Sequence, residues 1–174
     1  MDYQIKSKET IVKTPILDVQ GLTVLNPQKY ELKRIVVKKP GAVVVVPITQ
    51  DNQVVLVKQW RAGTEKYMLE LPAGVIDPGE SPEITAQREL REEIGYKSEN
   101  LVFLGQSYVS PGYLTEKFHF FLARNLEYSP LPPDEHEDLE ILTMDFQQAL
   151  NSHQVKEDVK SWLGLLAAEK HLKI

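Results

Sequence analysis

The chain has 174 residues, with 20 Lys and Arg against 25 Asp and Glu, a formal net charge of −5, and 42% hydrophobic residues. This balance indicates one ordinary globular domain and excludes collagen-like or wholly disordered chains. No Cys is present, which excludes a disulfide scaffold and fits a reducing compartment. The first residues lack the apolar core of a signal peptide, and the longest apolar stretch, 42–48, is too short to cross a bilayer. We therefore expect a cytoplasmic protein with no membrane partner.

Charge is distributed unevenly along the chain. Residues 1–40 carry 8 basic and 4 acidic side chains, whereas residues 41–174 carry 12 basic and 21 acidic ones. The basic residues are dispersed and form no stripe, so no nucleic-acid partner is expected. Pro40-Gly41 marks the expected boundary between an N-terminal β segment, 1–40, and the main domain, 41–174.

Short β-like runs lie on both sides of this boundary. Residues 16–24 and 30–37 flank Asn26-Pro27, a turn signal, and predict a small antiparallel sheet. After the boundary, the β-branched runs 42–48 and 54–60 flank a polar turn and predict a β-hairpin.

A helix is predicted to follow, from Ser81 to about Gly95. Ser81 can cap the free amides, and Pro82 suits the first helical position because its missing N–H is not needed there. Glu83 meets the positive end of the helix dipole. These signals fix where the helix begins.

The last third of the chain predicts more strands and then helices. β-like runs occur at 101–104, 118–123 and 141–144, and an acidic, proline-rich loop, 129–140, precedes the third of them. Two helices are predicted to close the chain. In the second, apolar residues recur at helical spacing and predict one buried stripe, formed by Val155, Val159, Trp162, Leu163 and Leu166.

Three carboxylates lie close together on the helix that begins at Ser81. Glu89, Glu92 and Glu93 stand at positions i, i+3 and i+4, which places them in one arc of the helix. Like charges so placed repel one another, and a divalent cation would compensate. Oxygen ligands without Cys or a neighbouring His favour Mg²⁺ or Mn²⁺ over Zn²⁺. The alternative is a solvated glutamate face in which Arg88 and Glu92 form an ordinary ion pair.

The residues around this helix resemble the Nudix box. Gly74, five further residues, Glu80, seven further residues and then the segment 88–95, Arg-Glu-Leu-Arg-Glu-Glu-Ile-Gly, match that motif. Tyr96 departs from it, because the family usually has an aliphatic residue there. The resemblance implies the Nudix fold, an α/β (α+β) architecture in which a mixed β-sheet lies between α-helices. It also implies hydrolysis of a nucleoside diphosphate linked to another moiety.

The flanking residues are similar to the branch of this family that hydrolyses ADP-ribose and nucleotide sugars. The similar segments are Gln59-Trp60-Arg61, the run 70–74, and Ser110-Pro111-Gly112. Pro111 follows Tyr96 by 15 residues, a spacing that accompanies ADP-ribose hydrolysis in the family. The resemblance implies that five residues contact the substrate: Arg61, Glu70, Pro111, Gly112 and Glu116.

Further site residues are also implied by the resemblance. Two to three Mg²⁺ or Mn²⁺ ions would be held by Ala73, through its carbonyl, and by Glu89, Glu92, Glu93 and Glu137. Catalysis would depend on Glu92, Glu93 and a general base from the acidic loop, Glu135, with His136 as the alternative base. Arg88 is expected to orient the glutamates through salt bridges, and Glu80 to support them.

The expected reaction is metal-dependent hydrolysis of the diphosphate linkage of ADP-ribose or a related nucleoside diphosphate sugar, giving a nucleoside monophosphate and a sugar phosphate, which are AMP and ribose 5-phosphate for ADP-ribose. One alternative is a broader pyrophosphatase for GDP-mannose, ADP-glucose or UDP-glucose. A non-catalytic ADP-ribose sensor is a weaker alternative, because Glu89, Glu92 and Glu93 are all present. Residues 1–40 resemble the additional sheet with which this branch forms homodimers, so a homodimer is expected.

Overall fold

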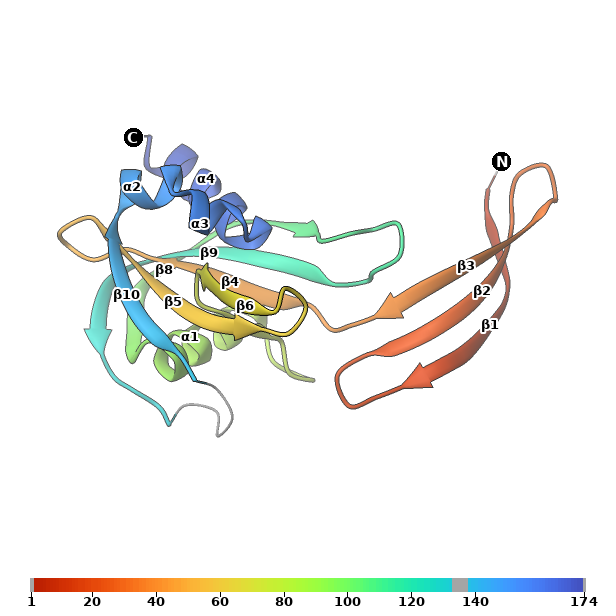
Figure 1. Ribbon diagram of the computed structural model, residues 1–174, viewed down its shortest axis with the longest axis horizontal. Helices are drawn as coiled ribbons and strands as arrows, with labels where there is room; N and C mark the ends of the chain where they lie inside the picture. Colours follow the sequence, from red (N-terminus) through yellow and green to blue (C-terminus); the bar gives the residue numbers. More distant parts are fainter. Residues whose placement is uncertain (1, 133–137, 174) are drawn as a thin grey trace. The chain divides into compact units, whose positions relative to one another are not determined.

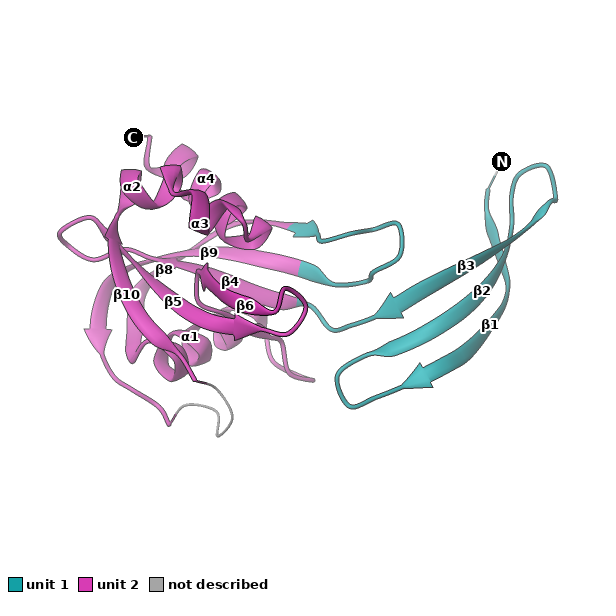
Figure 2. Cartoon of the chain, viewed as in Figure 1, with its two compact units in different colours: residues 1–41, 107–117 teal, residues 42–106, 118–174 magenta. Residues whose placement is uncertain are grey.

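The structure of the chain is a computed structural model that describes residues 2–132 and 138–173. The chain divides into two compact units (Figure 2). The first combines residues 1–41 with 107–117, and the second combines 42–106 with 118–174. The segment 107–117 therefore belongs with the N-terminal residues, an association that the sequence did not indicate.

The first unit is an antiparallel sheet of order β1-β2-β3, formed by β1 (Gln4–Lys13), β2 (Asp18–Leu25) and β3 (Glu31–Lys38). The predicted turn is present, because the Asn26 side chain accepts hydrogen bonds from the Gln28 and Tyr30 backbone N–H groups at 3.0 and 2.8 Å. The sequence did not predict β1. Every residue of this strand is exposed, so no buried alternating face marks it.

The segment 107–117 joins the first unit through main-chain hydrogen bonds. The Val37 N–H donates to the Tyr113 carbonyl at 2.7 Å, and the Thr115 N–H donates to the Val37 carbonyl at 3.0 Å. Val37 and Leu114 form a parallel bridge. The loop thus extends the edge of β3.

The second unit contains two sheets (Figure 1). One has the strand order β7-β4-β9-β8 and the other the order β10-β5-β6. Strand β4 is parallel to β9 and antiparallel to β7, so the first of these sheets is mixed. The strands are β4 (Ala42–Pro47), β5 (Gln53–Arg61), β6 (Lys66–Glu70), β7 (Ala73–Val75), β8 (Tyr96–Tyr108), β9 (Lys117–Tyr128) and β10 (Glu140–Asp145).

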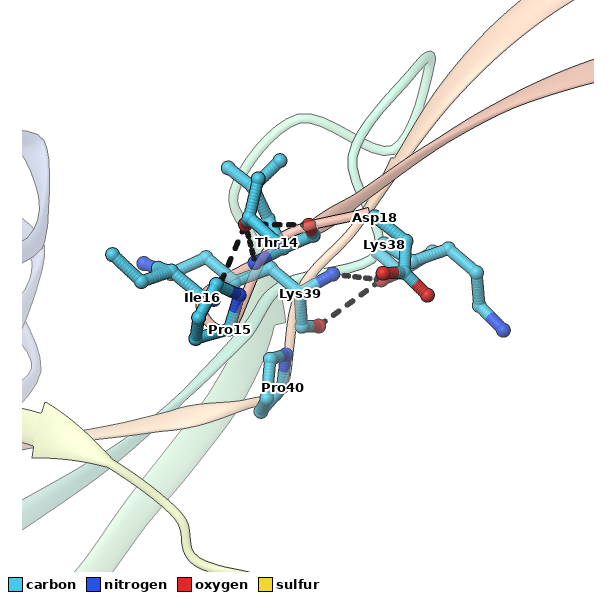
Figure 3. A pocket seen from close by; sticks show the side chains of 9 residues that line it. Thr14, Pro15, Ile16, Asp18, Lys38, Lys39 and Pro40 are labelled. Atoms are coloured by element: carbon cyan, nitrogen blue, oxygen red, sulfur yellow. Dashed lines mark hydrogen bonds between the residues drawn. The ribbon is translucent and has the colours of Figure 1, made fainter. Parts of the chain in front are cut away.

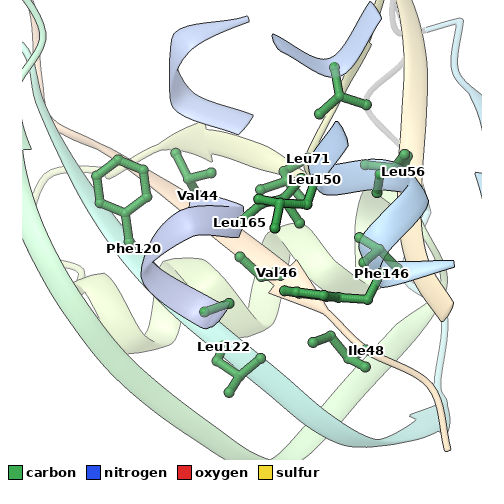
Figure 4. Packing of buried hydrophobic residues seen from close by; sticks show 14 of the residues in the cluster. Val44, Val46, Ile48, Leu56, Leu71, Phe120, Leu122, Phe146, Leu150 and Leu165 are labelled. Atoms are coloured by element: carbon green, nitrogen blue, oxygen red, sulfur yellow. The ribbon is translucent and has the colours of Figure 1, made fainter. Parts of the chain in front are cut away.

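Helices cover both sides of these strands. The helices are α1 (Pro82–Glu93), α2 (Phe146–Asn151), α3 (His153–Lys156) and α4 (Val159–Leu172). Val44 and Val46 of β4 pack into the core beneath α2 to α4, where Leu165 also lies (Figure 4). Val43 and Val45 pack into a second core that includes residues of α1. The predicted mixed sheet between helices is confirmed. Within residues 2–132 and 138–173, no helix combines the length and apolar character that crossing a bilayer requires.

The predicted hairpin of 42–48 and 54–60 is wrong. Both runs are strands, β4 and β5, but they belong to different sheets and meet at an isolated bridge between Ile48 and Val54. All of β4 is buried, so its side chains are covered on both faces, as in a central strand. Strand β5 pairs instead with β6 and β10.

The predicted apolar stripe near the C-terminus has the wrong phase. Val155 is buried as predicted, but the other four side chains are 39–60% exposed: Val159, Trp162, Leu163 and Leu166. Helix α4 buries a different set: Lys160, Ser161, Gly164, Leu165 and Ala168. Small residues let this helix approach the strands closely, since a Cβ on Gly164 would lie 2.8 Å from Leu71 Cδ1. Three helices, rather than the expected two, follow β10.

Candidate active site

Helix α1 begins and ends where the sequence predicted. The Ser81 hydroxyl accepts a hydrogen bond from the Ile84 N–H at 3.4 Å, and Pro82 is the first helical residue. Beyond the C-cap, Gly95 has φ +78°, a conformation that glycine adopts without strain. These local signals place the glutamates of the box on defined faces of the helix.

The Arg88 guanidinium binds several carboxylates of the box. Its guanidinium donates to Glu89 Oε1 at 2.7 Å, to Glu92 Oε2 at 2.9 Å and to Glu80 Oε2 at 3.3 Å, and it also reaches the Val75 carbonyl at 3.1 Å. The predicted salt bridges of Arg88 are thus confirmed. Burial disfavours the charged guanidinium, but the hydrogen bond with Glu80 and the charges of Glu89 and Glu92 outweigh it and raise the pKa of Arg88.

Glu80 holds this cluster to the start of the helix. Its Oε2 accepts a hydrogen bond from the Thr85 hydroxyl at 2.8 Å in addition to the bond from Arg88. The hydrogen bond from Thr85, followed by that from Arg88, lowers the pKa of Glu80. Glu80 therefore supports Arg88 as an anion, in line with its expected supporting role.

Two glutamates are buried against β7, the short strand that precedes the helix and the turn leading into it. Glu89 is 8% exposed and Glu93 is 6% exposed. Glu93 Oε2 accepts a hydrogen bond from the Ala73 N–H at 3.1 Å. A Cβ on Gly74 would lie 1.9 Å from the Glu89 carboxyl carbon, so glycine is the residue that lets this backbone pass so close to the carboxylate. The loop and the helix thus form one site.

The donor set at this site fits a hard divalent cation. Carboxylate oxygens are the ligands that Mg²⁺ and Mn²⁺ prefer, and one guanidinium faces four carboxylates here. Within residues 2–132 and 138–173, however, no three His, Cys, Asp or Glu side chains are already arranged as a metal cluster. Arg88 contacts two of the expected ligands, Glu89 and Glu92. The expected ligand Glu137 and the two candidate bases, Glu135 and His136, lie outside the described residues.

A second cluster lies at the ends of β5 and β6. Arg61 donates from Nε to Glu70 Oε1 at 2.9 Å and from Nη2 to Glu70 Oε2 at 2.7 Å. The Lys160 ammonium also bonds Glu70 Oε2, and it donates to Asp158 Oδ2 at 2.8 Å. Glu70 is 3% exposed, whereas the Arg61 side chain is 41% exposed. Glu70 therefore faces the protein interior, and part of Arg61 faces solvent.

The charges in this cluster reinforce one another. Burial alone would raise the pKa of Glu70, but the hydrogen bond from Arg61 and the charge of Lys160 outweigh it and lower that pKa. The hydrogen bond with Glu70 raises the pKa of Arg61 despite burial, and the charges of Glu93 and Asp158 add to this effect. Because Glu93 acts on Arg61, the second cluster lies within electrostatic reach of the box.

Three residues of this cluster were not predicted from the sequence: Asp158, Lys160 and Ser161. Asp158 is the N-cap of α4 and accepts a hydrogen bond from the Ser161 N–H at 3.1 Å. This capping pattern was the available signal for where the helix begins. Nothing local indicated that the polar Lys160 and Ser161 face inward, because their partners, Glu70 and Leu71, are 90 residues away.

The other predicted substrate contacts belong to the first unit. Pro111 and Gly112 lie in a turn closed by the Leu114 N–H, which donates to the Ser110 carbonyl at 2.9 Å. Glu116 is 6% exposed and accepts a hydrogen bond from Lys39 Nζ at 2.6 Å. The structure thus brings Arg61 and Glu70 together in one unit and places Pro111, Gly112 and Glu116 in the other.

A pocket of about 330 Å³ also lies in the first unit (Figure 3). The Thr14 hydroxyl donates to the Leu17 carbonyl at 2.8 Å and closes the turn at its rim. The pocket is lined by Thr14, Pro15, Ile16, Leu17, Asp18, Lys38, Lys39, Pro40 and Thr115. None of these is a predicted metal ligand or catalytic residue.

A mixed sheet between helices, with a glutamate-bearing helix behind a close-packed glycine loop, defines a Nudix-type domain. Residues 38–163 match the NUDIX domain family. The chain is 37% identical over 153 residues to the ADP-ribose pyrophosphatase of Bacillus subtilis (strain 168), covering 87% of this chain and 83% of that protein. It is 40% identical over 139 residues to the methanol dehydrogenase activator of Bacillus methanolicus, covering 78% of this chain and 72% of that protein.

Solved structures agree with this assignment. The crystal structure of an ADP compounds hydrolase superposes with a TM-score of 0.89 and 27% identity, covering 99% of this chain and 95% of that chain. This chain therefore belongs to the Nudix family, and the predicted family is confirmed. Nudix hydrolases generally need divalent metal ions.

Proposed function

We propose that this protein hydrolyses the diphosphate linkage of ADP-ribose or a related nucleoside diphosphate sugar, releasing a nucleoside monophosphate and a sugar phosphate, which are AMP and ribose 5-phosphate when the substrate is ADP-ribose. The observation that carries the proposal is the site around Gly74, where Glu89 and Glu93 are buried against the loop. That site lies in a Nudix chain that is 37% identical to an ADP-ribose pyrophosphatase over 87% of its length.

We propose that Glu89, Glu92 and Glu93, with the Ala73 carbonyl, hold Mg²⁺ or Mn²⁺, and that Glu137 completes a set of two to three ions. A bound metal ion would neutralise the diphosphate and lower the pKa of a bound water. Glu135 is the proposed general base, which takes the proton of the attacking water.

Arg61 is the proposed diphosphate ligand from β5. Two of its N–H groups bind Glu70, and a guanidinium has five, so three remain for phosphate oxygens. Its partial exposure lets it reach a substrate. Glu70 is buried, so we assign it the role of holding Arg61 rather than of touching the substrate. Pro111, Gly112 and Glu116 stay proposed substrate contacts.

We also propose that the protein is a cytoplasmic homodimer that associates through residues 1–40. Apolar side chains of β1 support this interface, since Ile5, Ile11 and Val12 are about half exposed on a strand without buried residues. Size-exclusion chromatography with light scattering checks the dimer, and a monomer at micromolar concentration would contradict it.

The test of the function is product analysis on a panel of compounds with Mg²⁺ or Mn²⁺. The panel includes ADP-ribose, ADP-glucose, UDP-glucose, GDP-mannose, NADH, diadenosine polyphosphates and deoxynucleoside triphosphates. Preferential release of AMP and ribose 5-phosphate from ADP-ribose supports the proposal. Comparable cleavage of several nucleotide sugars favours the broader pyrophosphatase. Binding of ADP-ribose without any cleavage would contradict the enzymatic role.

A further inference from the structure

The first turn of α4 is tied to the end of β6 by buried polar groups. The Leu71 N–H donates to the Ser161 hydroxyl oxygen at 2.7 Å, and Ser161 is fully buried. The neighbouring Lys160 is 9% exposed, and its ammonium bonds both Glu70 and Asp158. Glu70 and Leu71 stand immediately before the loop that carries Gly74. The helix thus supports the strand end from which the box loop departs.

The Glu70 carboxylate is shared between two cations. Its Oε2 accepts hydrogen bonds from both Lys160 and Arg61 Nη2, while Oε1 accepts from Arg61 Nε. If Lys160 were absent, the charge of Glu70 would be balanced by Arg61 alone. Arg61 would then present less positive charge to an anion. With Lys160 in place, Oε2 of Glu70 is bonded by two cations, which keeps the paired Arg61 guanidinium in one orientation.

The buried Lys160 ammonium is paired with two carboxylates, Glu70 and Asp158. Removing a lysine charge from water is costly, and lysine is seldom this buried without a paired anion. The Ser161–Leu71 hydrogen bond already joins the helix to the strand without a charge. The Lys160 charge is thus not needed to join the helix to the strand, and through Glu70 it acts on Arg61.

We propose that Lys160 is a positioning residue for substrate binding, which shares the Glu70 carboxylate with Arg61 and so holds the Arg61 guanidinium in a fixed orientation toward the substrate diphosphate. This inference rests on the proposed function, in which Arg61 binds the diphosphate. Lys160 itself need not contact the substrate.

The test compares Lys160→Met with the charge-conserving Lys160→Arg. The control is Lys97→Met, which removes the same charge from an exposed lysine paired with Glu127 at 2.9 Å. The first readout is the ¹⁵N–¹H signal of the Arg61 Nε–H group in the substrate-free protein, assigned by its loss in Arg61→Gln. The second is KM and kcat for ADP-ribose with Mg²⁺.

In Lys160→Met, the Arg61 signal should shift or broaden, KM should rise roughly tenfold, and kcat should stay within about threefold. In Lys160→Arg, KM should return most of the way to the wild-type value. Lys97→Met should have the KM and kcat of the wild type. An unchanged Arg61 signal with unchanged KM would overturn the inference, as would a loss of kcat alone.

A replacement variant and a readout that does not depend on activity keep this test decisive. If Lys160→Met does not fold, Lys160→Gln replaces it, because the amide keeps a hydrogen-bond donor and removes only the charge. If the wild type cleaves no compound, the proposed function fails, yet the Arg61 signal still decides whether Lys160 positions this guanidinium. A changed signal supports that part of the inference, and an unchanged one overturns it.

Discussion

The cluster around Arg88 and the cluster around Arg61 both combine cations with carboxylates, but in different proportions. One guanidinium, that of Arg88, lies within 3.8 Å of four carboxylates, those of Asp77, Glu80, Glu89 and Glu92. In the other cluster, the two cations Arg61 and Lys160 share the buried Glu70 carboxylate, and Lys160 also pairs with Asp158. The first cluster carries an excess of negative charge, whereas the second does not.

This difference teaches what each cluster can bind. Carboxylates that outnumber their cations repel one another, so the Arg88 cluster is suited to receive an added cation. The Arg61 cluster is already balanced inside the protein and leaves part of one guanidinium exposed, so it is suited to an anion. A metal-bound diphosphate needs both kinds of cluster. The predictions below separate them.

The largest effect is expected from Glu93→Gln. This change removes one carboxylate charge from the negative cluster, while the amide oxygen can still accept the hydrogen bond from the Ala73 N–H. Turnover of ADP-ribose should fall by at least about 100-fold, with an unchanged circular dichroism spectrum. Glu99→Gln, on the exposed part of β8, is the matched control and should retain activity. Near-normal turnover in Glu93→Gln would refute the metal assignment.

A smaller but still large effect is expected from Gly74→Ala. The new Cβ would lie 1.9 Å from the Glu89 carboxyl carbon, so the loop or the carboxylate must move. Turnover should fall about 10- to 100-fold, because a displaced ligand weakens metal binding. Isothermal titration of Mn²⁺ and steady-state kinetics check this. Gly63→Ala is the control, since no atom lies within 4 Å of its added Cβ. Equal Mn²⁺ affinity and equal turnover in Gly74→Ala and Gly63→Ala would contradict the close approach of Gly74 to the Glu89 carboxylate.

In the balanced cluster, Glu70→Gln should act on stability. It leaves the Arg61 and Lys160 charges without their shared carboxylate, so the free energy of unfolding near neutral pH should fall by about 2–3 kcal/mol. Urea unfolding measures this loss. Glu65→Gln, an exposed carboxylate in the turn between β5 and β6, should leave stability unchanged.

The same variant has a defined pH dependence. The folded-state pKa of Glu70 is lowered below its ordinary value of 4.5 by Arg61 and Lys160, which overcome the effect of burial. A lowered pKa contributes stability that is complete above the unfolded value and is lost as the pH falls through the folded value. The difference in the free energy of unfolding between wild type and Glu70→Gln should therefore stay constant from about pH 8 to about pH 5 and become smaller below that range. If this difference in stability did not become smaller in acid, the lowered pKa of Glu70 would be contradicted.

The sequence predicted the parts of the site that depend on local spacing. The cap at Ser81, the end of α1 before Gly95 and the salt bridges of Arg88 all follow from residues within about two turns of one another. The resemblance to the Nudix box identified Gly74, and the structure supplies the reason, the Glu89 carboxylate beside it.

Features that depend on distant partners were not predictable in this way. The face of α4 that is buried is set by the packing of Gly164 on Leu71. Lys160 is buried because it pairs with Glu70, which is 90 residues away in the sequence. Apolar periodicity alone favoured the opposite face of the helix. Strand β4 illustrates the same point, because a run buried on both faces looks like one strand of a hairpin until its neighbours are known.

The smallest effect is expected from Lys66→Met. The Lys66–Glu157 pair has a 2.8 Å contact, and its side chains are 48% and 37% exposed. Water and salt screen such a pair, so the Tm should change by less than about 2 °C and become insensitive to the substitution at about 1 M NaCl. Thermal unfolding at low and high salt checks this. If Lys66→Met lowered the Tm as much as Glu70→Gln, burial would not be the reason why the ion pairs of Glu70 stabilise the protein. The Arg61 and Arg88 clusters would then differ only in their numbers of charges.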